Sequence, residues 1–222
     1  MSVSSQLSRI KETINEACEE CGRDAENITI IGVTKYVSID RAKETLAAGV
    51  TNLGENRKEE FLEKYEAIGK EAIWHFIGSL QSRKVRDVIN EVDYIHSLDR
   101  KSLAKEINKR ADRIVPCFVQ VNISGEESKH GLAPDEVEKF IESMANYENI
   151  KVVGLMTMAP HEDQEEALRA VFRKLRALRD IIRDKQEPHA PCEWLSMGMS
   201  NDYRLAIEEG ATHIRVGSSL VG

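Results

Sequence analysis

The sequence predicts an α/β fold, a (β/α)8 TIM-type barrel with an extra helix at the amino terminus and a last helix that is short or absent. Short apolar segments typical of strands alternate with helical segments along the chain, and its 222 residues contain eight such strand segments. No Pro/Gly-rich linker or internal repeat divides them. Regular alternation implies parallel strands with right-handed crossovers, and an open doubly wound sheet suits eight strands at this length less well. We therefore expect residues 1–222 to form a single barrel domain.

The expected strands are short segments rich in β-branched and aromatic residues and bounded by polar residues or glycine. The first, Ile28–Val33, is typical of a buried strand, and Pro116 is tolerated in the fifth because it lies near the strand start. We expect strands at residues 28–33, 51–54, 73–77, 94–97, 115–121, 151–156, 193–196 and 211–216.

The helices between these strands are indicated by end signals or by apolar residues at helical spacing. Gly49 is a C-cap, and Pro134 occupies the first position of its helix. We expect helices at residues 39–48, 57–68, 81–89, 101–110, 134–144, 164–185 and 202–209. Because the sequence stops at Gly222, soon after the last strand, we expect the last helix of the barrel to be short or absent. We expect the amino-terminal helix, at residues 6–21, to cover the gap that this leaves.

Composition excludes several classes of function. The chain has 31 Lys and Arg against 38 Asp and Glu, a net charge of -7, which argues against broad binding to nucleic-acid phosphates. No apolar run approaches the roughly 20 residues that span a membrane. Residues 1–8 show no secretory signal pattern, so we expect a cytoplasmic protein with no membrane partner.

The four cysteines do not make a metal site. Cys18 and Cys21 form a CxxC pair, but neither a second CxxC nor a close histidine pair completes four zinc ligands. Both also fit the apolar face of the first helix. We therefore expect packed, reduced thiols and no bound metal.

Polar residues follow several of the expected strands, where the active face of such a barrel lies. Lys35 comes just after the first strand, and Asn56 follows the second. Partial desolvation at the barrel mouth favours a neutral lysine amine, which can form a Schiff base with a carbonyl group. By position alone, a solvated lysine at a strand end is the favoured interpretation of Lys35.

The loops after the last two strands have the chemistry of a phosphate site. Ser200 lies before an expected helix, and Gly217 and Ser218 follow the last strand. Small residues let backbone N–H groups approach a phosphate, and barrels frequently bind phosphate at these two loops. Ordinary turn and N-cap chemistry would use the same residue types. Together with Lys35, the loops suggest one ligand with a phosphate and an aldehyde, as in pyridoxal 5′-phosphate (PLP).

Arg215 limits the chemistry of such a ligand. Arginine donates hydrogen bonds and accepts none, so a pyridine nitrogen facing it must accept and stay unprotonated. The ring would then be a poor electron sink. The alternative for Arg215 is a surface ion pair with Glu208 or Glu209, and for His75 we expect a buried, hydrogen-bonded histidine.

At these residues the sequence resembles a known family, the pyridoxal phosphate homeostasis proteins, which are similar to the barrel domain of alanine racemases standing alone. The matches run from Gly32 to the carboxyl terminus in the family's order. They are Gly32-Val33-Thr34-Lys35, Leu53-Gly54-Glu55-Asn56, His75-Phe76-Ile77-Gly78-Ser79-Leu80-Gln81, Val121-Asn122-Ile123, Gly154-Leu155-Met156-Thr157-Met158-Ala159, Leu195-Ser196-Met197-Gly198-Met199-Ser200 and Arg215-Val216-Gly217-Ser218. Tyr36-Val37 and Arg83 depart from the family's pattern.

The resemblance implies a set of cofactor-binding residues. Lys35 would hold PLP as an internal aldimine, Arg215 would face the pyridine nitrogen, and Asn56 would line the pocket. The phosphate would be held by Ser200, Gly217 and Ser218.

Three hypotheses for function follow. The leading one is a PLP carrier or buffer in intracellular cofactor homeostasis, with little or no catalysis, apo-enzymes as recipients, and a monomeric or weakly dimeric state. The alternative is a PLP-dependent amino-acid racemase, which needs an acid/base on each face of the substrate, whereas only Lys35 is identified here. A Schiff-base aldolase-type barrel without cofactor would also use Lys35, but it explains Arg215 less well.

Overall fold

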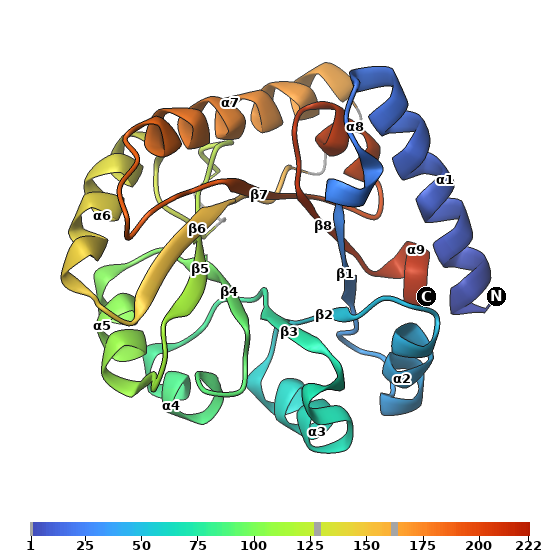
Figure 1. Ribbon diagram of the computed structural model, residues 1–222, viewed down its shortest axis with the longest axis horizontal. Helices are drawn as coiled ribbons and strands as arrows, with labels where there is room; N and C mark the ends of the chain where they lie inside the picture. The colour runs from blue at the N-terminus through green and yellow to red at the C-terminus, as the bar shows by residue number, and fades with distance from the viewer. Residues whose placement is uncertain (1, 127–129, 161–163) are drawn as a thin grey trace.

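The strands form a closed parallel barrel. The computed structural model describes residues 2–126, 130–160 and 164–222, and within them eight strands pair in sequence order, with β1 completing the ring by pairing with β8 (Figure 1). The strands are β1 (Thr29–Val33), β2 (Asn52–Glu55), β3 (Ile73–Phe76), β4 (Tyr94–Leu98), β5 (Val115–Gln120), β6 (Ile150–Met156), β7 (Trp194–Met199) and β8 (His213–Val216). This confirms the predicted (β/α)8 barrel.

Helices surround the barrel as the sequence predicts. They are α1 (Val3–Cys21), α2 (Ile39–Ala47), α3 (Lys58–Ile68), α4 (Val85–Val88), α5 (Lys101–Arg110), α6 (Val137–Ser143), α7 (Glu165–Asp184), α8 (Tyr203–Glu208) and α9 (Ser218–Val221). The segments predicted as single helices at 81–89 and 134–144 instead combine short 3-10 turns with α4 and α6. Of the helices in the described part of the chain, none combines the length and the apolar character that crossing a bilayer requires.

The amino-terminal helix covers the end of the barrel, as expected. The final helix, α9, is only 4 residues long, and α1 packs against both α8 and α9 (Figure 1). Arg23, which follows α1, donates hydrogen bonds to the carbonyl oxygens of Ile207 (2.6 Å) and Ala211 (2.7 Å). These bonds satisfy carbonyl groups at and just after the end of α8 that have no partner within the helix. The short last helix therefore leaves the barrel closed.

Two details differ from the sequence-based expectations. β7 continues to Met199 rather than ending at residue 196, because Gly198, at φ 91°, lets the strand pass close to α8. A Cβ on Gly198 would lie 2.6 Å from the Cβ of Ala206. Cys21, expected to be packed, is exposed, because α1 ends there and the chain turns away at Gly22. Cys18 is buried as predicted.

The space inside the barrel is more polar than the layer between strands and helices. The main apolar core lies between the sheet and the surrounding helices, whereas Phe118, Val153 and Met156 form a separate small cluster. His75, His96, Ser196 and Arg215 are also buried and hydrogen-bonded to one another in series. These inward-facing polar side chains connect the two ends of the barrel.

Candidate functional site

The predicted site residues gather at the carboxyl ends of four neighbouring strands. Lys35 follows β1, Asn56 follows β2, Ser200 follows β7, and Arg215 lies in β8. The strands β7, β8, β1 and β2 are consecutive in the closed ring. Residues that are up to 180 positions apart in the sequence therefore share one mouth of the barrel, here called the carboxyl-terminal mouth.

Lys35 lies in the turn just beyond β1, and its side chain is exposed. The expected desolvation of this amine is therefore wrong for the protein alone, because β1 ends at Val33 and the chain turns outward two residues later. The Lys35 ammonium nitrogen lies 5.7 Å from the ring centre of Tyr36, which adopts a left-handed φ of 65°. The sharp turn presents the amine at the edge of the mouth.

A buried ion pair fixes the ends of β1 and β2. The Lys64 ammonium of α3 donates to Glu55 Oε1 (2.8 Å) and to the carbonyl oxygen of Thr34 (2.7 Å), and the Thr34 hydroxyl donates to the same Glu55 oxygen (2.6 Å). Lys64 is 4% and Glu55 0% exposed. Burial raises the pKa of Glu55 despite these hydrogen bonds. Because Thr34 and Glu55 directly precede Lys35 and Asn56, this cluster holds both site residues in register.

The backbone of Asn56 lies in close contact with Gly78. A Cβ on Gly78 would lie 2.3 Å from the carbonyl oxygen of Asn56, so only glycine fits at this position, two residues after β3. In the described part of the chain, the buried Oδ1 of Asn56 has no hydrogen-bond partner. Such an atom is unusual, and it can accept a hydrogen bond from a water molecule or a ligand.

Ser200 joins the two loops that were predicted to hold a phosphate. Its hydroxyl oxygen accepts hydrogen bonds from the backbone N–H groups of Gly217 (3.2 Å) and Ser219 (3.4 Å). The buried hydroxyl of Ser219 has no partner among the described residues. Ser218 is exposed, and its backbone carbonyl accepts from Gly222 within α9. Hydroxyl and backbone N–H donors therefore converge at this corner, as an anion requires.

Arg215 is a buried cation inside the barrel rather than part of a surface ion pair. It is 4% exposed, and its guanidinium donates to Ser196 Oγ (2.6 Å) and to the carbonyl oxygen of Thr157 (2.8 Å). Both acceptors are uncharged. Burial lowers the pKa of Arg215 to about 10, so it remains charged at neutral pH. The surface alternative is wrong, because Glu208 and Glu209 pair with arginines of α7 and α8.

A chain of hydrogen bonds runs from Arg215 through the barrel interior. Ser196 Oγ lies 2.9 Å from His96 Nδ1, His96 Nε2 lies 2.9 Å from His75 Nδ1, and His75 Nε2 lies 2.9 Å from Asn52 Oδ1. Because arginine only donates, one consistent assignment has Ser196, His96 and His75 each donate to the next member, ending at the Asn52 oxygen. Burial keeps the pKa of both histidines well below the usual value, so both are neutral.

The sequence predicted His75 as a buried, hydrogen-bonded residue, which the structure confirms, but it did not reveal its partner His96 or the Ser196 hydroxyl bonded to His96. It also did not single out Ser219. One signal was available, because His75 and His96 interrupt the apolar patterns of adjacent strands, as inward-facing polar residues do. In the described residues, no group of three or more histidine, cysteine or acidic side chains could hold a metal ion.

Comparisons with known proteins agree with this geometry. The family model described as "Alanine racemase, N-terminal domain" matches residues 6–222. The chain is similar to the pyridoxal phosphate homeostasis protein of Aquifex aeolicus, with 43% identity over 226 residues that cover 100% of this chain and 98% of that protein. The protein of the same name from Pseudomonas aeruginosa is 32% identical over 224 residues, covering 99% of this chain and 95% of its own.

Solved structures give the same picture. PipY of Synechococcus elongatus PCC7942, solved with PLP bound, matches with a TM-score of 0.86 and 28% identity, covering 99% of this chain and 100% of that one. The alanine racemase of Corynebacterium glutamicum matches with a TM-score of 0.72 and 13% identity, covering 99% of this chain and 60% of that one. At this low identity the racemase match shows a shared fold alone.

Proposed function

Because this chain belongs to the family of pyridoxal phosphate homeostasis proteins, we propose that it binds PLP at the carboxyl-terminal mouth and carries or buffers it, with little or no catalysis. The observation that carries the proposal is the convergence of Ser200, Gly217 and Ser219 at one corner, beside the buried cation Arg215. We further propose that residues 1–222 act as one cofactor-binding domain in the cytoplasm, as a monomer or weak dimer, and that apo-enzymes receive the cofactor.

The donor set fits this cofactor. A phosphate needs several N–H and O–H donors, and the Ser219 hydroxyl is buried without a partner among the described residues, next to N–H groups that otherwise bond to Ser200. The amine of Lys35, which follows β1 two strands from β7, is exposed and has no ion-pair partner among the described residues, so it is available to an aldehyde. Asn56 offers the unpaired oxygen described above, which suits a hydroxyl or N–H donor on the ligand.

Each residue then has a binding role. Lys35 would provide the amine that holds the aldehyde of the cofactor. Ser200, Gly217 and Ser219 would orient the phosphate, and Ser218, exposed in the same turn, would contribute its side-chain hydroxyl. Arg215 has five N–H donors, two of which bind Ser196 and Thr157, and it would donate another to the pyridine nitrogen.

Arg215 also explains why catalysis is expected to be weak. Bound PLP supplies an electron sink, which is strongest when its ring nitrogen is protonated. A guanidinium has N–H donors and no acceptor, and Arg215 is charged at neutral pH, so a ring nitrogen facing it would accept a hydrogen bond and stay unprotonated. Arg215 would therefore keep the ring nitrogen unprotonated, the state in which the cofactor is the weaker electron sink.

Absorbance spectroscopy of the purified protein tests the proposal. Wild-type protein reconstituted with PLP should absorb visible light through its bond to Lys35, and Lys35→Ala should lose this absorbance while remaining folded. Lys43→Ala, at a lysine on α2, is the matched control and should behave as wild type. A wild-type protein that takes up no PLP would overturn the proposal. Rapid loss of optical activity of L- or D-alanine, in proportion to protein, would overturn the weak catalysis.

A further inference from the structure

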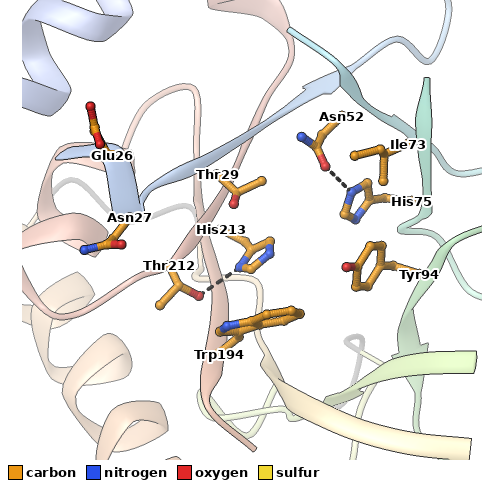
Figure 2. A pocket seen from close by; sticks show the side chains of 10 residues that line it. All are labelled: Glu26, Asn27, Thr29, Asn52, Ile73, His75, Tyr94, Trp194, Thr212 and His213. Atoms are coloured by element: carbon orange, nitrogen blue, oxygen red, sulfur yellow. Dashed lines mark hydrogen bonds between the residues drawn. The ribbon is translucent and has the colours of Figure 1, made fainter. Parts of the chain in front are cut away.

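A second concave site lies at the opposite end of the barrel. A cavity of about 450 Å³ opens at the amino-terminal ends of the strands, with Thr29 and Asn52 at its sides and Glu26 and Asn27 at its rim (Figure 2). This volume is within the roughly 300–1,000 Å³ that small-molecule sites have. The family resemblance assigns no role to these residues, and the proposed PLP site uses none of them.

Flat aromatic surfaces make up two walls of this amino-terminal cavity. The rings of His75 and Tyr94 stack, with centres 4.7 Å apart and planes 6° apart. On the other wall, the Trp194 ring centre lies 5.0 Å from that of His213 and 6.1 Å from that of Tyr94. Figure 2 shows these four rings arranged around the cavity. Such walls suit a planar ligand, because flat rings bury large apolar areas against one another.

Two unpaired polar groups enter the cavity from its two walls. Thr212 binds the Nδ1 atom of His213 (2.8 Å), so Nε2 of this 6% exposed residue is left without a partner in the described residues. The Tyr94 hydroxyl, also without a partner there, points toward His213 in Figure 2. Neither atom is among the fully buried, unpartnered polar atoms of the described residues, so both are accessible from the cavity. A ligand with a donor and an acceptor on its edge would bond to both.

The charge of the cavity excludes anions. Burial lowers the pKa of His75 well below the usual histidine value and lowers that of His213 to about 4. Burial also raises the pKa of Tyr94. All three groups are therefore neutral at pH 7. Glu26 is the charged residue among those lining the cavity, and neither lysine nor arginine is among them. Helices that precede the strands also end on this side, with their partial negative charge.

We propose that the amino-terminal cavity is a second ligand site, which binds an uncharged, planar nitrogen heterocycle carrying a hydrogen-bond donor and an acceptor. The ring would lie in the cavity against the exposed surfaces of these aromatic walls, with its polar edge on His213 Nε2 and the Tyr94 hydroxyl. A phosphorylated ligand does not fit, so this site discriminates by charge against the cofactor proposed for the other mouth.

Nuclear magnetic resonance of the ¹⁵N-labelled full chain tests the site, with nicotinamide as the neutral probe and nicotinate as its anionic counterpart. The chain has two tryptophans, and Trp194→Phe identifies the indole signal of the one in the cavity. Nicotinamide should shift the Trp194 signal with saturation and leave the Trp74 signal unmoved. Nicotinate should give no saturable shift. No saturable nicotinamide shift, or equal shifts by both probes, would overturn the proposal.

Two single-atom variants make the test specific. Tyr94→Phe should raise the dissociation constant for nicotinamide roughly 3- to 10-fold, as expected for one lost hydrogen bond between neutral groups. Tyr203→Phe, at the start of α8 and the other end of the barrel, is the matched control and should change nothing. Equal affinities in the two variants would contradict the assigned hydrogen bond. If Tyr94→Phe does not fold, Thr29→Trp provides a second variant, because it fills the cavity and should abolish saturation. Both measurements are independent of PLP uptake.

Discussion

The two mouths of this barrel have opposite chemistry although the same eight strands form both. The carboxyl-terminal mouth carries Lys35, the buried cation Arg215 and convergent N–H groups around Ser200. The amino-terminal mouth carries neutral aromatic and imidazole rings and an acidic rim. In a parallel barrel, helices begin at one mouth and end at the other, so anions are favoured only at the first. The direction of the strands thus separates anion binding from the binding of neutral molecules.

The two mouths also differ in how they are supported, and the hydrogen-bonded chain Asn52–His75–His96–Ser196–Arg215 connects them. The carboxyl-terminal mouth rests on the buried Thr34–Glu55–Lys64 cluster behind β1 and β2. The amino-terminal mouth rests on stacked rings and on neutral histidines. Variants that break one kind of support should therefore respond differently to charge and pH from those that break the other.

The largest effect is expected from breaking the ion pair that supports the carboxyl-terminal mouth. Lys64→Met leaves the Glu55 carboxylate buried without its cation, and we expect a loss of about 3–5 kcal/mol in the free energy of unfolding. Urea unfolding at pH 7 measures this loss. The double variant Glu55→Leu plus Lys64→Met removes both charges and should recover much of it. A loss below about 1 kcal/mol in Lys64→Met would show that the pair does not support the mouth.

Mild acid should lower the free energy of unfolding by somewhat less than Lys64→Met does, because it acts on the buried histidines of the barrel interior. The pKa of His75 and His96 lies well below its ordinary value of 6.5, and that of His213 is about 4. As the pH falls below 6.5, the unfolded chain binds protons that the folded chain refuses, so stability decreases. Between pH 7 and 5.5 each histidine should cost about 1 kcal/mol, or roughly 3 kcal/mol for all three.

Urea unfolding at several pH values measures this acid sensitivity. The stability present above pH 6.5 should fall progressively until the pH reaches the folded-state pKa values. His213→Gln is the informative variant, because it removes one of the three buried histidines and should reduce the pH dependence of the free energy of unfolding by about a third. His189→Gln, at a partly exposed histidine outside the barrel interior, is the control. A wild-type free energy of unfolding that does not change from pH 7 to 5.5 would contradict the prediction that the buried histidines stay neutral in the folded protein.

Removing Ser196 should have a smaller effect that reaches both mouths. Ser196→Ala takes away the acceptor of Arg215 and the partner of His96 Nδ1, which should cost about 1–3 kcal/mol in the free energy of unfolding. It should also shift the visible absorbance of bound PLP, since Arg215 loses one of the contacts that orient it. Ser97→Ala is the control, because its buried hydroxyl has no partner in the described chain. An unchanged spectrum would show that Ser196 does not position Arg215.

Local patterns explain how much of this could be predicted from the sequence. Strand and helix positions depend on neighbouring residues, so the order of elements and the covering role of α1 were predictable, whereas the extension of β7 depended on Gly198 packing against α8. The hydrogen-bonded chain was not predictable, because His96 lies 21 residues from His75 and 100 from Ser196. The exposure of Lys35 depends on the Tyr36 turn, whose left-handed conformation is not a preference of tyrosine.

The smallest effect is expected from Ser219→Ala, which tests the phosphate corner of the carboxyl-terminal mouth alone. Ser219→Ala removes a buried hydroxyl that has no partner among the described residues, so the free energy of unfolding should not fall. The dissociation constant for PLP should rise roughly 3- to 10-fold, whereas that for pyridoxal, which lacks the phosphate, should stay the same. Ser102→Ala, on the exposed side of α5, is the matched control. Because the change is in affinity for one ligand of a pair, a general loss of stability cannot imitate it. Equal weakening of PLP and pyridoxal would instead place the Ser219 hydroxyl away from the phosphate.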